Sequence, residues 1–396
     1  MKTADEHFSV WAEIDLEAIA HNIAAVRQLI TPGTDIMAVV KADAYGHGIV
    51  NVARTAHAAG VDAFGVARLG EALALRKSGF KNRILIFGYT PPAAAGELIN
   101  NNLIQTVFSR CYAAALNEKA RNAKGRIKIH IKIDTGMGRL GLLPATLRGV
   151  NEDIKKEKST ICNSVASIVK LTNLETEGIF THFAASDSYD KKSAGRQLTL
   201  FREVTSLLEA DGVHIPVKHA ANSGAVIDLP EAHLDMVRPG IMLYGLYPSA
   251  EVAHHKVILR PAMQVKARIA QVKNVSKGFR VSYGETHITS GPTRLATVPV
   301  GYADGYRRKL SSSGVMLVKG VRAPVVGRVC MDQSVIDVGH IKDVHCGDEV
   351  VIIGRQGEAV LSAEEMAREL ETINYEIVSA LMARVPRIYS GLSSSS

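Results

Sequence analysis

The sequence lacks the features that would direct a protein into a membrane, out of the cell or around a structural metal. No run of 18 or more apolar residues occurs, which excludes a candidate transmembrane helix. Asp5 and Glu6 stand where a secretory signal peptide needs an apolar stretch. The four cysteines are scattered and show no metal-ligand spacing: Cys111, Cys162, Cys330 and Cys346. We therefore expect a cytoplasmic protein with reduced thiols, no metal ion and no membrane partner.

A concentrated basic patch is also missing, although the formal net charge is +8. The densest basic groups, at residues 155–158 and 307–309, are short and contain no interleaved aromatic residues. Nucleic-acid binding usually needs a basic patch or stripe, so we expect no nucleic-acid partner. The charge fits a solvated surface and an anionic small ligand.

The first part of the chain alternates short apolar strands with helical segments. At 396 residues the chain exceeds the size at which one core stops growing, so we expect two domains. Eight strands, each followed by a helix or turn, predict an α/β fold with a (β/α)₈ barrel over residues 12–246. An open doubly wound sheet is the alternative, but no GxGxxG motif follows the first strand. The predicted strands are 36–40, 63–66, 83–87, 104–108, 127–133, 177–182, 215–220 and 235–238, and the clearest helices are 16–30, 49–59, 69–78 and 193–210.

Beyond residue 246 the pattern changes to alternating apolar and polar residues with frequent Gly and Pro. This pattern predicts a mainly antiparallel β domain over residues 247–390, with one helix near 363–370. An opening strand at 8–14 fits either domain, and we assign residues 1–11 to the β domain. The serine-rich residues 391–396 are expected to form a disordered tail.

The segment Val39–Gly48, VVKADAYGHG, is the most informative stretch of the chain. Two β-branched residues lead directly into Lys41, and Tyr, Gly and His follow within a turn-like segment. A lysine at the tip of a buried strand is desolvated and can lose its proton. Such an amine can form a Schiff base with an aldehyde, and pyridoxal 5'-phosphate (PLP) is the commonest biological reason to need one. The alternative is a solvated loop lysine.

Four further polar positions follow predicted barrel strands, where active sites of such barrels lie. Each has a structural alternative, since His182 could be a core histidine and Asn222 a helix cap. The loops after the last two strands also offer hydroxyl and backbone N–H groups to a phosphate. A Schiff-base lysine opposite a phosphate site fits PLP laid across the barrel mouth. The positions are Arg139, His182, Asn222–Ser223 and Arg238, and the phosphate loops are 222–224 and 239–241.

From about Trp11 to Tyr389 the chain resembles the bacterial alanine racemases, PLP enzymes with a barrel and a β domain. The resemblance rests on VVKADAYGHG, KIDTGMGRLG (132–141), VRPGIMLYG (237–245), VSYGET (281–286), VPVGYADG (298–305), GRVCMDQ (327–333) and RVPRIY (384–389). It implies an isomerase that interconverts L- and D-alanine for D-alanine supply and peptidoglycan precursors.

The resemblance also implies roles for individual residues. Lys41 would be the PLP lysine, and Arg139 would contact the phenolic oxygen of the ring and the substrate. His182 would pack against the pyridine ring and Arg238 would face its nitrogen. Lys132 matches a lysine that is carbamylated in some members. The phosphate would be held by Tyr45, Ser223, Gly240 and Ile241 beside Asn222, and the pocket and its entrance would include Asp187, Tyr302, Arg308, Arg328 and Ala383.

Inverting an α-carbon needs one base on each face of the substrate, because the proton leaves one side and returns on the other. Lys41 can serve one face, and the resemblance assigns the other to Tyr283. A free tyrosine has a pKa of about 10, so it needs nearby positive charge to act as a base. In the family, residues matching Tyr283 and Met331 enter the active site of the partner subunit. A homodimer with two shared sites is therefore implied.

Three alternative functions are also compatible with the sequence. A racemase of the same family for serine or for several amino acids is the first alternative. A barrel-type PLP decarboxylase would share the lysine and the phosphate loops, but it would place an acidic residue where Arg238 stands. A non-catalytic PLP carrier would not need the β domain.

The chain departs from the family pattern at two places. Residues 150–176 look like a polar surface insertion. Ala383 stands where alanine racemases typically carry a pocket tyrosine.

Overall fold

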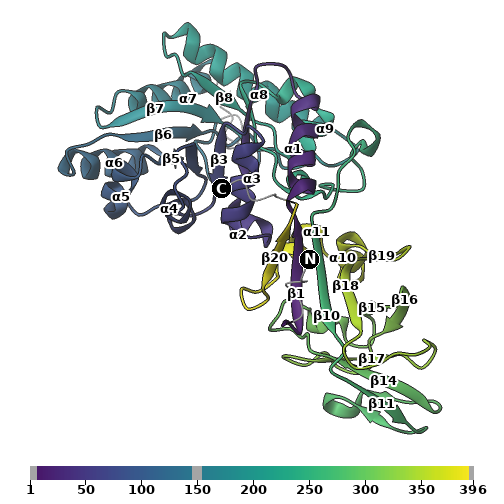
Figure 1. Ribbon diagram of the computed structural model, residues 1–396. Coiled ribbons are helices and arrows are strands. Elements are labelled where there is room, and N and C mark those ends of the chain that lie inside the picture. Colours follow the sequence, from purple (N-terminus) through teal and green to yellow (C-terminus); the bar gives the residue numbers. More distant parts are fainter. Residues whose placement is uncertain (1–6, 145–153, 392–396) are drawn as a thin grey trace. The chain divides into compact units, whose positions relative to one another are not determined.

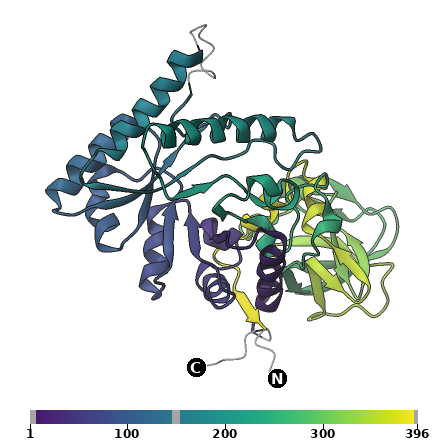
Figure 2. The same cartoon turned by 90° about the horizontal axis from the view of Figure 1, so that it is seen from above.

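The computed structural model describes residues 7–144 and 154–391, and for residues 154–160 it describes the backbone alone. The chain forms two compact units. The barrel unit comprises 19–44 and 49–260, and the second unit comprises the described parts of 1–18, 45–48 and 261–396. Figures 1 and 2 show the ribbon of both units. Among the described helices, none is long and apolar enough to cross a membrane.

The barrel unit is built on a closed barrel of eight parallel strands that pair in chain order, so the predicted fold class is confirmed. Helices lie outside these strands (Figure 2). The strands are β2 Asp35–Val39, β3 Ala63–Val66, β4 Arg83–Ile86, β5 Ile104–Val107, β6 Ile127–Lys132, β7 Leu174–Phe180, β8 Val217–His219 and β9 Met236–Val237. The helices are α1 Leu16–Leu29, α2 Lys41–Tyr45, α3 Ile49–Ala58, α4 Leu69–Lys77, α5 Ala95–Asn100, α6 Arg110–Asn122, α7 Ile154–Val169, α8 Lys192–Ala210 and α9 Ser223–Asp228, with short 3₁₀ turns η1 Pro92–Ala94, η3 Pro230–Ala232, η4 Ile241–Tyr244 and η5 His254–Lys256.

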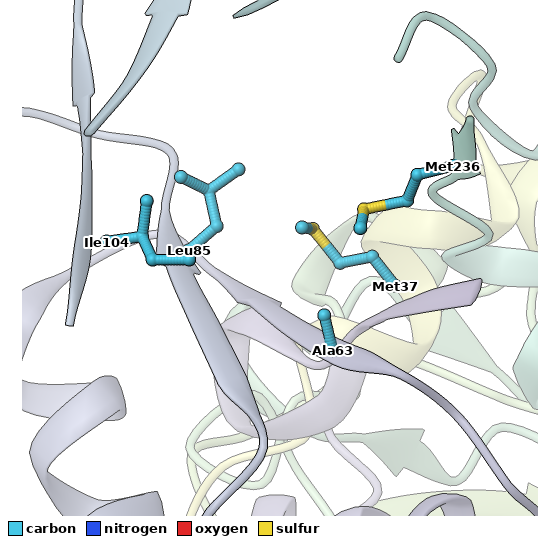
Figure 3. Packing of buried hydrophobic residues seen from close by; sticks show 5 residues of the cluster. All are labelled: Met37, Ala63, Leu85, Ile104 and Met236. Carbon is cyan, nitrogen blue, oxygen red and sulfur yellow. The ribbon is translucent and has the colours of Figure 1, made fainter. Parts of the chain in front are cut away.

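Apolar side chains fill part of the barrel interior. Five of them form one cluster from β2, β3, β4, β5 and β9, each at most 2% exposed. Figure 3 shows their side chains directed toward one another, with the thioethers of Met37 and Met236 side by side. Methionine fills irregular gaps because its side chain is unbranched and flexible. The cluster is Met37, Ala63, Leu85, Ile104 and Met236.

The predicted insertion at 150–176 is a regular part of the barrel from residue 154 onward. Residues 150–153 lie outside the described residues. Helix α7, Ile154–Val169, connects β6 to β7 in the order that the barrel requires, and Val165 and Ile168 on it are buried. The segment begins with the polar residues KKEKST, which make the apolar stripe of the helix hard to recognise in the sequence. The insertion interpretation is therefore wrong for the described residues.

Within the described residues, the second unit contains two helices and three sheets, in which every strand pair except β1–β20 is antiparallel. Its main sheet has the order β16-β15-β18-β10-β1-β20, with β19 paired to β18, and two smaller sheets are β11-β14-β17 and β12-β13. The opening strand β1 pairs antiparallel with β10 and parallel with β20, so it belongs to this unit. Helix α11 was not predicted, and residues 392–396 of the predicted tail lie outside the described residues. The elements are β1 Val10–Asp15, β10 Met263–Arg268, β11 Gln271–Val275, β12 Arg280–Val281, β13 His287–Ile288, β14 Thr293–Val298, β15 Val315–Val318, β16 Val321–Pro324, β17 Ser334–Asp337, β18 Glu349–Gln356, β19 Ala359–Leu361, β20 Arg387–Ser390, α10 Ala363–Glu369, α11 Asn374–Ser379, η6 Tyr283–Glu285 and η7 Arg308–Leu310.

Candidate active site

Lys41 follows strand β2 and directly precedes four residues with a rare backbone conformation. Ala42, Asp43, Ala44 and Tyr45 all have left-handed helical angles, with φ between +52° and +54°. For residues with a Cβ, this conformation costs roughly 1–2 kcal/mol per residue, and it is normally adopted by single glycines or asparagines. Four such residues in a row persist only where the surroundings hold them. The turn therefore fixes the direction in which the chain leaves Lys41.

Hydrogen bonds hold the left-handed turn at both ends. The Glu71 carboxylate accepts the backbone N–H of Ala42 at 2.7 Å and that of Ala67, after β3, at 2.7 Å. The Asp43 carboxylate accepts the N–H of Ile49 at 2.8 Å. Glu71 thus ties the turn that carries Lys41 to the end of the neighbouring barrel strand. In the sequence, Glu71 is marked only by its place three residues after Arg68, as in a capping box, and it is not among the predicted site residues.

Two lysines of the barrel unit have lowered pKa values. Burial lowers the pKa of Lys41, and the positive charge of Arg139 lowers it further. Burial likewise lowers the pKa of Lys132, the last residue of β6, to about 8, and Arg139 and Arg238 add to this effect. Each lysine therefore has a larger neutral fraction near neutral pH than a solvated lysine. A neutral amine is the form that attacks an aldehyde or carbon dioxide.

Arg238, after β9, is a buried cation at 3% exposure. Its Nη1 lies 2.8 Å from Nδ1 of His219, and its Nη2 donates to the carbonyl oxygen of Thr181 at 2.8 Å and lies 3.2 Å from Nδ1 of His182. Burial lowers its pKa to about 9, which leaves it charged at neutral pH. No carboxylate among the described residues forms an ion pair with it. A barrel-type PLP decarboxylase would have an acidic residue in place of Arg238, and no acidic group is among the described contacts of Arg238.

Asp134 shapes the loop that presents Arg139. One carboxylate oxygen accepts the backbone N–H groups of Gly136, Met137 and Gly138 at 2.8–3.1 Å. Three donors on one oxygen form a tight turn directly after β6. Arg139 extends from this loop and is exposed, but its charge still acts on both lysines. The sequence of this motif alone does not predict the role of its aspartate.

The two predicted phosphate loops are joined to each other. The Ser223 hydroxyl accepts the backbone N–H of Gly240 at 2.9 Å. Asn222 caps helix α9, because its Oδ1 accepts the N–H of Ala225 at 3.1 Å, and the Ser186 hydroxyl donates to the same oxygen at 2.6 Å. The structural alternative for Asn222, a helix cap, is therefore confirmed.

Little space is left beside these loops. A Cβ added to Gly224 would lie 3.0 Å from the backbone nitrogen of Asp187, the predicted entrance residue, and Ile241 is fully buried at the start of η4.

The remaining predicted residues lie in the second unit, and several of them are neighbours. The backbone N–H of Tyr302 donates to the carbonyl of Cys330 at 3.1 Å, which brings Tyr302 beside Met331. The Ser282 hydroxyl donates to the carbonyl of Arg328 at 2.6 Å, directly before Tyr283. Tyr283 is 71% exposed and Met331 is 51% exposed. The unit thus presents the predicted second base and its neighbours on its surface.

The two neighbours of Ala383 in the sequence are bonded to the same region of the second unit. The backbone N–H of Met382 donates to the carbonyl of Asp304 at 3.1 Å. The Arg384 guanidinium forms ion pairs with Asp304 at 2.7 Å and with Asp332 at 2.6 Å. Ala383 itself is exposed, and its methyl group is too small to cover the neighbouring surface.

Arg308 and Tyr45 complete the predicted residues of the second unit. Arg308 is exposed at the start of η7. Tyr45 is 8% exposed, and its ring centroid lies 6.0 Å from that of Tyr375. Burial raises the pKa of the Tyr45 hydroxyl, so it stays protonated and can act as a donor.

The residues of the barrel unit fit PLP. Arg238 is a buried cation whose partners in the described part of the chain are all neutral, and the lowered pKa of Lys41 favours the amine that attacks an aldehyde. An anionic ligand would balance the positive charges of Lys41, Arg139 and Arg238. The Ser223 hydroxyl lies at the backbone of Gly240, directly before Ile241 at the start of η4, which brings a hydroxyl to the second phosphate loop.

Comparison with known proteins agrees with the resemblance. The N-terminal domain of alanine racemase matches residues 14–248, and its C-terminal domain matches residues 262–389. The chain is 50% identical to the alanine racemase of Desulfosudis oleivorans over 98% of both chains, and 48% identical to that of Desulforamulus reducens over 96% of this chain and 99% of the relative.

Solved structures agree as well. The alanine racemase of Clostridium difficile 630 superposes with a TM-score of 0.89 at 39% identity, covering 97% of this chain and 96% of the other. That of Bacillus anthracis with bound L-Ala-P superposes with a TM-score of 0.89 at 36% identity, covering 97% and 96%. The chain belongs to the alanine racemase family of PLP-dependent isomerases.

Proposed function

We propose that the chain interconverts L- and D-alanine with Lys41 and Tyr283 as the two bases. The observation that carries this assignment is the cationic cluster at the carboxyl ends of the barrel strands, where burial and Arg139 lower the pKa of Lys41. In its neutral form Lys41 can hold the cofactor and, once the substrate amine has displaced it, its freed amine can accept the α-proton from one face of the substrate. PLP, when bound, supplies the electron sink that makes this proton acidic.

Tyr283 would hold and return the proton on the opposite face. Its role needs a cation near the phenol oxygen, and Arg328 lies in the same unit. The Nη1 of Arg328 is 3.1 Å from the position that a Cβ on Gly284, the next residue, would occupy. Arg328 is therefore the cation that we propose to stabilise the charge of a phenolate at Tyr283.

Arg238 would keep the ring nitrogen of the cofactor unprotonated. An arginine donates hydrogen bonds and does not give up a proton at neutral pH, so the nitrogen facing it would act as the acceptor. The ring would then be a weaker electron sink than one beside a carboxylate. Return of the proton becomes the main exit, which favours racemisation over transamination.

Lys132 is the proposed site of carbamylation. Its pKa of about 8 leaves part of the amine neutral at physiological pH, and carbon dioxide reacts with the neutral form. A carbamate would replace a positive charge by a negative one next to Arg139, whose charge now acts on Lys132. It would thereby orient the Arg139 guanidinium toward the substrate.

The working assembly proposed is a homodimer with two shared sites. Tyr283, Tyr302 and Met331 are large side chains exposed in the chain, at 71%, 41% and 51%. A partner barrel would cover them, as expected for a symmetric interface that completes a site. The four free cysteines fit the reducing cytoplasm, where we place the enzyme.

A racemisation assay against a panel of L-amino acids tests this function. The purified chain with added PLP is expected to convert L-alanine to D-alanine fastest, and to show an absorption band in the visible region from bound cofactor. Chiral chromatography measures the products. Conversion of another amino acid with release of carbon dioxide, and no D-alanine, would overturn the assignment in favour of a decarboxylase.

Ala383 is expected to widen the range of substrates. Replacing the tyrosine of the family by a methyl group enlarges the pocket, and a simple pocket discriminates one extra group by about 10- to 200-fold. Tyr389 is not free to refill the space, because its hydroxyl lies against Gly48, where an added Cβ would be 1.9 Å from it. We therefore expect serine to be accepted better than in a typical alanine racemase.

The measurement is kcat/KM for alanine and for serine in the wild type and in Ala383→Tyr. The substitution should raise the ratio of alanine to serine by about tenfold or more. Because Ala383 is exposed and its side chain is small, the added ring should leave the unfolding temperature unchanged. An equal ratio in both proteins would show that position 383 does not set specificity.

A further inference from the structure

The barrel unit contains a buried chain of polar side chains behind Arg238. The Nη1 of Arg238 lies 2.8 Å from Nδ1 of His219, and Nε2 of His219 lies 2.8 Å from Nδ1 of His130. His219 ends β8, and His130 lies on β6, two residues before Lys132. The exposed fractions of the three side chains are 3%, 0% and 1%. The chain of contacts thus runs from the site into the barrel interior.

A glycine on the strand between them makes this contact possible. His130 pairs with Gly178 of β7 in the barrel register. A Cβ added to Gly178 would lie 2.7 Å from Nδ1 and 2.8 Å from Nε2 of His130, so the imidazole ring lies directly over this glycine. Any larger residue on β7 would push the ring away from His219. The geometry is therefore built for an imidazole at position 130.

The hydrogen-bond donors and acceptors along the contacts from Arg238 through His219 to His130 can be arranged in only one way. Arginine has no acceptor, so Nδ1 of His219 must carry a lone pair toward Arg238. A neutral His219 then bears its proton on Nε2 and donates it to Nδ1 of His130, which leaves the proton of His130 on Nε2. Both rings are neutral near pH 7, since burial and the charge of Arg238 lower the pKa of each.

Packing of the core does not by itself require an imidazole at position 130. Its Nε2 is buried and has no hydrogen-bond partner among the described residues. A buried polar atom without a partner destabilises the fold, so an apolar residue at this position would pack more favourably. The only polar contact of the imidazole in the described residues is the one to His219.

We propose that His130 is a positioning residue that fixes the tautomer of His219 and, through it, the orientation of the Arg238 guanidinium. Without an acceptor at position 130, the Nε2–H of His219 would be unpaired, and the ring could move its proton to Nδ1. An N–H of His219 would then face an N–H of Arg238, and the guanidinium would turn away. This inference rests on the proposed function only where it links Arg238 to the cofactor ring.

The test compares His130→Leu, which removes the acceptor, with His130→Asn, whose Oδ1 takes the place of Nδ1. His233→Leu is the matched control, because His233 is also buried in the barrel unit, yet bonds only to the Val226 carbonyl through Nε2. The first readout is the ¹⁵N spectrum of histidine-labelled protein without cofactor. His219 should show one neutral Nε2–H tautomer in the wild type, His130→Asn and His233→Leu, and a mixture in His130→Leu.

The second readout uses the protein with ring-labelled PLP. In His130→Leu the ¹⁵N shift of the cofactor ring nitrogen should move, and kcat should fall about 10-fold with KM unchanged, as is common when an outer partner of a site residue is lost. His130→Asn should restore both values. If His130→Leu does not fold, His130→Val, which also lacks an acceptor, replaces it in the same comparison.

The outcomes separate the two proposals. An unchanged His219 tautomer in His130→Leu, or a change equal to that in His233→Leu, would overturn the role of His130. A shifted tautomer with no racemisation in any variant, wild type included, would support the role of His130 and refute the proposed function instead.

Discussion

Lys41→Ala is expected to abolish racemisation and to leave the protein without covalently attached cofactor. Lys41 is proposed both to hold PLP and to move the α-proton, so the loss should exceed about 10⁴-fold, the upper part of the range for a positioned acid–base group. Borohydride treatment of the wild type should remove the visible absorption and fix the cofactor to the peptide that contains Lys41. Mass spectrometry of the digested protein identifies the labelled residue.

Lys132→Ala is the matched control for this experiment. Lys132 is the second buried lysine of the cluster, at 6% exposure, and its pKa is lowered by burial and by Arg139, as is that of Lys41. This variant should keep a reducible cofactor on Lys41, although the orientation of Arg139 and therefore the rate will suffer. Cofactor that remains reducible in Lys41→Ala would show that another amine carries it.

Tyr283→Phe is expected to bind PLP normally and to lose at least about 10²-fold in turnover. Only the hydroxyl is removed, and the side chain is 71% exposed in the chain, so folding should be unaffected. Because Tyr283 serves one face, exchange of the α-proton in deuterated water should fall much more for one enantiomer than for the other. Equal loss for both enantiomers would contradict the two-base assignment.

Mixing the two inactive variants tests the shared site directly. If Lys41 and Tyr283 of one site come from different subunits, a hybrid of Lys41→Ala and Tyr283→Phe chains contains one intact site. Random re-association should then restore about a quarter of the wild-type activity. No recovery after subunit exchange, with hybrids shown by native mass spectrometry, would place both bases in one chain.

The barrel could be predicted from the sequence because its strands are short apolar runs separated by helical segments. The strand at 63–66 was predicted with its observed bounds, since AFGV is apolar throughout and all four residues are buried. The prediction of strand boundaries from the sequence is less accurate where the alternating patterns of two consecutive strands run together. The alternation of MQVKARIAQVKNV (263–275) continues across the turn between strands β10 and β11, so the sequence pattern does not separate these two strands.

The strand-end rule located most of the barrel site, but it could not show how the site is held. Lys41, Arg139, His182, Ser223 and Arg238 all follow barrel strands, and a rule about strand ends is sufficient to place them. The left-handed turn after Lys41 contradicts the preferences of Ala, Asp and Tyr, so no local pattern predicts it.

The residues that support the site act from elsewhere in the chain. Glu71, at the N-terminal turn of α4, bonds to Ala42 of the turn from 29 positions away in the sequence, and His219 supports Arg238 from a neighbouring strand. Such contacts depend on the three-dimensional register of the strands. They become visible only when the barrel is assembled.

The position of β1 has a consequence for how the chain is made. Ala12 in β1 stands opposite Arg387 in β20, so the first strand to leave the ribosome waits for one of the last. The separation is roughly 375 residues, which at about 5–20 residues per second takes roughly 20–75 s of translation. During this time one edge of β1 exposes unpaired N–H and C=O groups. The eight barrel strands lie between Asp35 and Val237, so they can pair while β1 is still without β20. A nascent chain stalled before residue 387 should therefore hold a protease-resistant barrel and a strand that chaperones can bind.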